Sequence, residues 1–198
     1  SPNYLSLFNC NVKRDCHLGI DIFTAVGTNI FSPLDGRVVI LKNNSFEFDY
    51  GPTIVLEHSI NKQIKFYTLY GHLSKKCLKT LSIGQKIKKG NLLAQIGNFP
   101  INGNWSPHLH FQIILDMMGE KDNFPGVSEE FLLSMWKKVS PDPNLILKIP
   151  NSFFKTQTNI KDLISKRRLF ISNTLSISYK KPLQILEAKG QYLYDHQG

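Results

Sequence analysis

The stretch SPHLHFQIIL, residues 106–115, is the most informative part of this chain about its fold. Apolar residues recur in it at every second position, namely Leu109, Phe111, Ile113 and Leu115. A period of two is typical of a β-strand that buries one face in a core. The other face then carries His108, His110 and Gln112 side by side. Because buried imidazoles need polar partners, the pattern predicts a site where two histidines converge on one ligand.

A second stretch, residues 14–23 (RDCHLGIDIF), offers further metal-binding side chains. Apolar and polar residues alternate in it, so an extended segment would direct His17 and Asp21 to the same face. Two imidazoles and one carboxylate suit zinc, and three protein ligands leave a fourth position for water. Zinc acidifies such a water enough to supply hydroxide near neutral pH. A third alternating stretch, residues 66–73 (FYTLYGHL), carries His72 near its end.

Three motifs of the chain resemble, in order and spacing, those of the lysostaphin/LytM-type zinc endopeptidases. They are residues 17–21 (HLGID), 70–73 (YGHL) and 107–111 (PHLHF). The likeness runs from about residue 14 to about residue 115 and includes residues 32–38, 84–90 and 94–97. The resemblance implies that His17, Asp21 and His110 bind zinc. It also implies that the two catalytic residues are His72 and His108.

The chemistry of these histidines can be checked against the roles that the resemblance implies. The chain lacks a His-Glu-x-x-His helix, so no glutamate between the ligands serves as general base. A histidine near its own pKa can take a proton from zinc-bound water, and a second histidine can hold the developing oxyanion. The sequence leaves open which of His72 and His108 does which. It also leaves open a catalytically silent module whose metal site only binds or docks a ligand.

The loop before the last motif is expected to border the substrate. Residues 98–107 (NFPINGNWSP) are rich in Pro, Gly and Asn, which is typical of an irregular loop. We place Trp105 and Tyr70 along the substrate groove, with packing of Trp105 on the sheet as the alternative. His58 has no motif partner and is interpreted as a hydrogen-bonded structural residue.

The predicted fold is mainly β. Strands are expected over residues 36–42, 53–58, 63–70, 91–96 and 108–115, separated by turns. The resemblance implies two antiparallel sheets that form a groove with zinc at its floor. Residues 128–139 (SEEFLLSMWKKV) predict a helix that covers the sheet, with Ser128 as its N-cap. A helical or extended C-terminal tail follows.

Composition sets limits on organisation and partners. The length of 198 residues suits a peptidase-like domain over 1–150 and a further segment over 151–198. No signal peptide or membrane-spanning run is visible, and the three cysteines lack paired spacing, so a cytoplasmic location is expected. The net charge is +9, and residues 59–115 contain eight lysines but no acidic residue. We interpret these lysines as a solvated rim, with neither nucleic acid nor membrane as a partner.

The end of the chain carries a separate resemblance. Residues 160–170 (IKDLISKRRLF) predict a short basic helix, and residues 188–195 (AKGQYLYD) are similar to the opening of class-III pyridoxal-phosphate-dependent aminotransferases. Pyridoxal phosphate would then belong to a missing downstream module. The chain is thus interpreted as one module of a larger protein, a zinc metallopeptidase or amidohydrolase. Its partners would be a peptide-like or amino-containing small substrate and the neighbouring domains of the full-length chain.

Overall fold

A computed structural model of the chain describes residues 14–61, 63–150, 187–189 and 192–194. The chain divides into two compact units, Ser1–Lys148 and Ile149–Gly198. In the second unit, β11 (Glu187–Lys189) pairs with β12 (Tyr192–Tyr194) in antiparallel fashion. The helix predicted over 160–170 lies outside the described residues. The domain boundary at residue 150 and the aminotransferase resemblance stay predictions.

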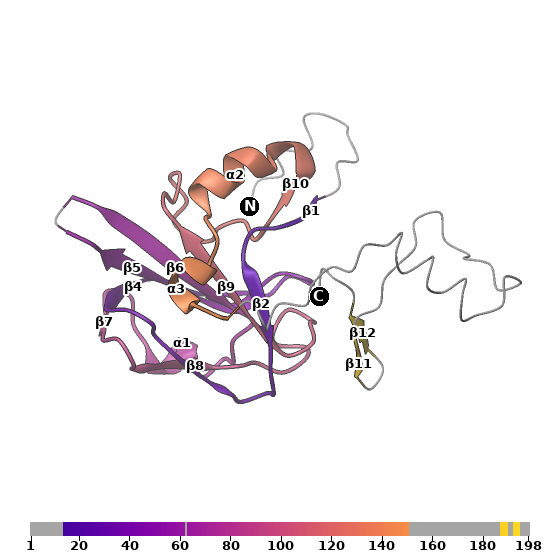
Figure 1. The fold of residues 1–198 in the computed structure, drawn as a ribbon. Helices are drawn as coiled ribbons and strands as arrows, with labels where there is room; N and C mark the ends of the chain where they lie inside the picture. The colour runs from indigo at the N-terminus through magenta and orange to yellow at the C-terminus, as the bar shows by residue number, and fades with distance from the viewer. Residues whose placement is uncertain (1–13, 62, 151–186, 190–191, 195–198) are drawn as a thin grey trace, which may run out of the picture. The chain divides into compact units, whose positions relative to one another are not determined.

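The first unit is built on a six-stranded antiparallel sheet (Figure 1). In spatial order its strands are β2 (Ile20–Phe23), β9 (His108–Ile114), β6 (Lys65–Gly71), β5 (Gly51–Ser59), β4 (Gly36–Asn44) and β7 (Lys86–Ile87). Two small antiparallel sheets accompany it: β3 (Asn29–Phe31) with β8 (Leu92–Gln95), and β1 (Arg14–His17) with β10 (Val127–Glu129). The mainly-β prediction with antiparallel sheets is therefore confirmed.

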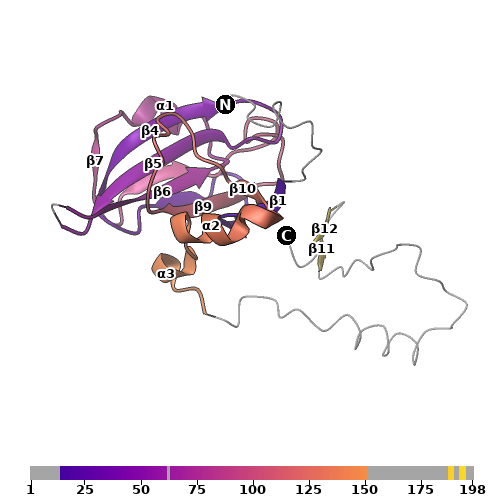
Figure 2. The ribbon, with the colours of Figure 1, turned by 90° about the horizontal axis from the view of Figure 1, so that it is seen from above.

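Alternation along the strands gives the large sheet a core on each face. On the first face, Phe111 of β9 packs with residues of β5, β8 and helix α1 (Cys77–Thr80). On the opposite face, Ile114 packs with Leu69 and Phe124 and is covered by Trp136 of helix α2 (Leu133–Val139). Figure 1 shows α2 and β8 on opposite sides of the sheet, and Figure 2 shows α2 and α1 on opposite sides of it. Each fully buried side chain of this size stabilises the fold by roughly 1.5–3 kcal/mol.

The covering helix begins later than the sequence predicts. Residues 127–129 form β10, which pairs with β1, and a short 3-10 helix, η2 (Glu130–Leu132), precedes α2. Ser128 is therefore a buried strand residue and not an N-cap, because pairing with a distant strand overrides the local capping signal. The predicted end of the helix is confirmed, since α2 stops before Ser140. One more helical turn, α3 (Asn144–Leu147), follows and packs on the first core.

The helices of the first unit are all short. Among the described residues, none of the helices combines the length and the apolar composition that a membrane span requires.

Candidate metal centre and active site

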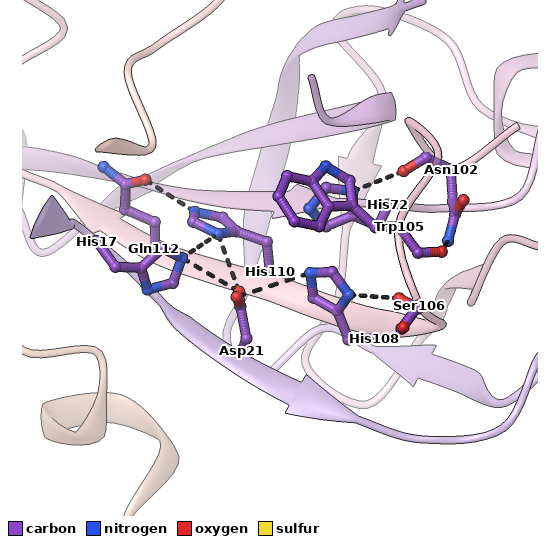
Figure 3. A network of polar contacts seen from close by, with 9 residues as sticks. All are labelled: His17, Asp21, His72, Asn102, Trp105, Ser106, His108, His110 and Gln112. Carbon is purple, nitrogen blue, oxygen red and sulfur yellow. Dashed lines mark hydrogen bonds and ion pairs between the residues drawn. The ribbon is translucent and has the colours of Figure 1, made fainter. Parts of the chain in front are cut away.

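The candidate site lies where β2 and β9 pair at one edge of the large sheet. The register places Asp21 opposite His110 and Phe23 opposite His108. Directly opposed residues of an antiparallel pair share one face, so all four side chains lie on the same side of the sheet. Figure 3 shows Asp21 between His110 and His108. This face is the one that carries Ile114, so β9 is polar at the site and apolar farther along.

His17 reaches the same site through a bend in the chain. The sequence predicts one extended segment through residue 21, but β1 ends at His17 and β2 begins at Ile20. Gly19 lies in this bend and packs closely on β9: a Cβ there would lie 2.7 Å from Nε2 of His110 and from the backbone oxygen of Phe111. The bend, rather than strand alternation, therefore aims His17 at the site.

Three donor atoms form a small triangle. Nε2 of His17 lies 2.9 Å from Nδ1 of His110, and Oδ1 of Asp21 lies 3.2 Å from each of these nitrogens. Zinc bonds of about 2.0–2.1 Å in a tetrahedral arrangement require donor separations of roughly 3.3 Å. The predicted ligands thus have both the chemistry and the spacing that fit one zinc ion. The identity of the ion stays a prediction.

The carboxylate of this triangle is held in its ionised form. Burial by itself raises the pKa of Asp21, but polar contacts with His110 and His17 outweigh that effect and hold the pKa well below its usual range. A metal ligand must be deprotonated, so Asp21 is ready to bind a cation without releasing a proton.

His108 and His72 stand beside the triangle with their rings 4.2 Å apart between centroids. His108 donates its Nδ1–H to the backbone oxygen of Ser106 at 2.6 Å. His72 donates its Nδ1–H to the backbone oxygen of Asn102 at 2.7 Å. A carbonyl oxygen can only accept, so in both neutral rings the lone pair lies on Nε2. Nε2 of His108 is 3.7 Å from Oδ2 of Asp21.

Both of these histidines are neutral near pH 7. Burial lowers the pKa of His72 to about 3, and the neighbouring His108 adds to the shift. Burial also lowers the pKa of His108, against the opposing pull of the Asp21 carboxylate. Each ring therefore offers a proton acceptor at Nε2 without first losing a proton.

Comparison with protein families identifies the family of the chain. The model of "Peptidase family M23" matches residues 15–122, which span every residue of the site. The chain belongs to the M23 peptidase family.

Curated relatives include two proteins of Vibrio cholerae serotype O1, the "Peptidoglycan DD-endopeptidase ShyA", 32% identical over 100 residues, and "ShyB", 31% identical over 100 residues. Each alignment covers 50% of this chain and 20% of the relative. This chain therefore spans about a fifth of the length of these relatives. A solved structure, the catalytic domain of lysostaphin from Staphylococcus simulans, is 19% identical, with a TM-score of 0.42, over 66% of this chain and 86% of that one.

The backbone of this M23 domain at His72 is unusual. Its φ of 61° lies in the left-handed region, which side chains with a Cβ seldom occupy. Two backbone hydrogen bonds hold it there. The His72 N–H donates to the backbone oxygen of Tyr50 at 2.7 Å, and the Gly97 N–H donates to the backbone oxygen of His72 at 2.9 Å. With the ring bonded to Asn102, three anchors fix the direction of Nε2.

The two side chains predicted along the groove lie in different environments. Trp105 is 40% exposed, with its ring centroid 6.2 Å from that of His72 and 6.4 Å from that of His108. It borders the site, as Figure 3 shows. Tyr70 is only 1% exposed, so its placement in the groove is wrong. It opposes Phe111 in the β6–β9 register and therefore faces the first core, on the opposite side of the sheet from His110.

Two residues that sequence reasoning missed complete the surroundings. Tyr50 is buried with its ring centroid 5.0 Å from that of His110. Its ring fits there because Gly71, directly opposite His110, has no Cβ; one would lie 2.7 Å from the Tyr50 ring. Asn102 anchors His72 through its backbone oxygen, which no side-chain pattern reveals. The only local signal for Tyr50 is its position between the turn at residues 46–49 and the start of β5.

Proposed function

We propose that this chain is the catalytic module of a zinc-dependent endopeptidase that hydrolyses an amide in a peptide-like substrate. The observation that carries the proposal is the triangle of Nε2 of His17, Oδ1 of Asp21 and Nδ1 of His110, with separations of 2.9–3.2 Å. Membership of the M23 family supports it. When bound there, zinc supplies a Lewis acid and lowers the pKa of a water molecule.

His108 is the better placed of the two histidines to carry a proton. Its Nε2 holds a lone pair and faces Oδ2 of Asp21 at 3.7 Å, so the carboxylate stabilises the imidazolium that forms. We assign His108 as the base that takes a proton from the attacking water. The same proton can pass to the leaving amine nitrogen as the carbon–nitrogen bond breaks, which yields a carboxylic acid and an amine.

His72 has a different part in this scheme. Its pKa of about 3 disfavours an imidazolium, and its Nδ1–H is already donated to Asn102. A neutral ring in this tautomer can accept a hydrogen bond at Nε2 but cannot donate one. We assign His72 as an acceptor for an N–H group of the substrate, which would align the scissile amide beside His108.

The substrate is proposed to be a peptide with an extended backbone. Exposed aromatic rings flank the histidines on two sides: Phe23 lies 5.0 Å from His108 between ring centroids, and Trp105 is 40% exposed. The relatives named as peptidoglycan DD-endopeptidases make cell-wall peptides one candidate. The tail resemblance makes a cytoplasmic, peptide-like or amino-containing substrate the other candidate, processed beside a class-III aminotransferase module.

Hydrolysis of two substrate sets tests the proposal. Purified chain is stripped of metal, reloaded with one equivalent of zinc, and incubated with purified sacculi and with short peptides containing glycine or alanine. We expect turnover with zinc and no turnover without it. His110→Ala should neither hydrolyse the substrates nor bind one equivalent of zinc. The control is His58→Gln, which alters a histidine of the same sheet outside the site. Stoichiometric zinc without hydrolysis of either set would contradict the proposal and favour a silent binding module.

A further inference from the structure

Gln112 connects the candidate metal centre to the segments that cover the sheet. It is two residues after His110 on β9, on the same face, and its side chain is fully buried. Its Oε1 lies 3.0 Å from Nε2 of His110. Its Nε2 donates to the backbone oxygen of Pro125 at 3.1 Å and to Oγ of Ser140 at 2.9 Å. Figure 3 shows Gln112 on the side of His110 away from His108.

These partners fix which way the amide points. The backbone oxygen of Pro125 can only accept a hydrogen bond, so the group of Gln112 beside it must be the NH₂. The carbonyl oxygen of Gln112 therefore faces His110. Because a carbonyl oxygen can only accept, Nε2 of His110 must carry a hydrogen and donate it to Gln112.

This hydrogen bond sets the state of the metal-binding atom. A neutral imidazole with its hydrogen on Nε2 has its lone pair on Nδ1. Nδ1 is the atom that lies 2.9 Å from Nε2 of His17 and 3.2 Å from Oδ1 of Asp21. With the other tautomer, His110 would turn an N–H toward the cation site and could not bind there.

We propose that Gln112 is a positioning residue that holds His110 in the Nε2–H tautomer and so prepares Nδ1 to bind zinc. The inference rests on the proposed zinc site but not on any substrate. Carbonyl and carboxylate partners of this kind orient metal-binding histidines, and their loss typically weakens metal binding 10- to 100-fold. Pro125 and Ser140, which lie in the segments before and after α2, hold the Gln112 amide in this orientation.

The tautomer of the metal-free protein gives a direct test that needs no variant. Long-range nitrogen–proton NMR correlations of ¹⁵N-labelled chain at neutral pH distinguish Nε2–H from Nδ1–H in each histidine. We expect Nε2–H for His110 but Nδ1–H for His72 and His108, which serve as internal references. An Nδ1–H signal for His110 would overturn the inference.

Two variants then measure the effect on zinc affinity by competition with a chelator. Gln112→Leu keeps the volume but removes the acceptor, so we expect zinc to bind about 10- to 100-fold more weakly and the His110 tautomers to mix. Ser140→Ala should stay within about threefold of wild type, because Pro125 still anchors the amide. A loss in Ser140→Ala equal to that in Gln112→Leu would overturn the inference, because packing alone would then explain both.

The outcomes also separate this inference from the proposed function. A wild-type chain with Nε2–H at His110 and tight zinc binding, yet without hydrolysis of any peptide, would contradict the peptidase proposal and leave the role of Gln112 supported. If Gln112→Leu does not fold, the tautomer of His110 in the wild-type chain still decides the question.

Discussion

Two kinds of buried histidine occur on the large sheet, and their second nitrogens distinguish them. His58 uses both nitrogens internally: Nδ1 contacts the backbone oxygen of Asp35 and Nε2 contacts Oγ1 of Thr68, each at 2.7 Å. His72 and His108 make hydrogen bonds only through Nδ1, and each directs Nε2 toward the candidate site, where Nε2 of His108 lies 3.7 Å from Oδ2 of Asp21. In the described part of the chain, Nε2 of His72 makes no hydrogen bond.

The comparison teaches that burial alone does not mark a catalytic histidine. His58 is 2% exposed and His108 is 4% exposed, and burial lowers the pKa of both. A ring with two protein partners has no acceptor left for a substrate or a water, whereas a ring with one partner keeps a directed lone pair. The following predictions would break or sharpen this distinction.

The largest expected effect follows removal of the directed lone pairs. We expect His108→Ala to lower kcat about 10²- to 10⁴-fold, because proton transfer by a positioned base contributes a factor of that size. Zinc content should stay at one per chain, since the three ligands remain. Steady-state kinetics and metal analysis on the same preparation check this outcome. An unchanged kcat would show that His108 is not the base.

Removal of the two-partner histidine should affect stability instead. His58→Ala removes one of the two hydrogen-bond partners of the fully buried Oγ1 of Thr68, leaves only the Tyr70 hydroxyl, and creates a cavity. We expect the free energy of unfolding to fall by about 3 kcal/mol, with kcat per folded molecule unchanged. Urea unfolding measures the free energy of unfolding. Titration with zinc counts the intact sites, and the initial rate divided by that number gives kcat per folded molecule. A large fall in kcat with normal stability would show that His58, despite its two partners, takes part in catalysis.

Both kinds of histidine should make the zinc-free protein less stable in acid. The unfolded chain binds a proton at each histidine below about pH 6.5, while the folded chain keeps His72, with its pKa of about 3, neutral. Between these two values the unfolded state binds more protons, so stability falls as the pH falls. Each such histidine contributes up to about 1.4 kcal/mol per pH unit.

Urea unfolding of zinc-free protein at pH 7, 6 and 5 tests this dependence. Asp21 does not disturb the window, because its lowered pKa contributes stability that is lost only below about pH 4. His72→Gln should flatten the slope, since it removes one group that the fold keeps neutral. Equal stability at all three pH values in wild type would show that these rings accept protons in the folded state.

The smallest effect is expected at the border of the site. Trp105 is 40% exposed beside both one-partner histidines, so its loss removes contact area but no lone pair. We expect Trp105→Ala to raise KM about tenfold, which corresponds to about 1.4 kcal/mol, with little change in kcat. Initial-rate kinetics over a range of substrate concentrations separate the two constants. A fall in kcat of the same size would place Trp105 in the catalytic step.

Sequence patterns predict the parts of the molecule that depend on local alternation. The strand over 108–115 and the shared face of His108 and His110 follow from a period of two. Patterns fail where distant segments decide the structure. The helix predicted from Ser128 begins late because β10 pairs with β1, and Tyr70 is buried because its register with Phe111 turns it to the first core.

The anchors of the site are the hardest features to predict. Asn102 acts through a backbone oxygen, and the direction of the Gln112 amide depends on Pro125 and Ser140, which are 13 and 28 residues away in sequence. No periodicity carries such information. His17 reaches its partners through a bend at Gly19, although the sequence predicts a continuous extended segment.

The left-handed backbone of His72 bears on which residue this position would carry in a related domain that no longer hydrolyses a substrate. A residue with a Cβ at a φ of 61° costs of order 1 kcal/mol relative to glycine. Under the proposed function, the placement of the His72 ring beside His108 offsets that penalty. In a relative that kept the scaffold only for docking, glycine or asparagine would be favoured at this position, because both adopt a positive φ more readily than histidine.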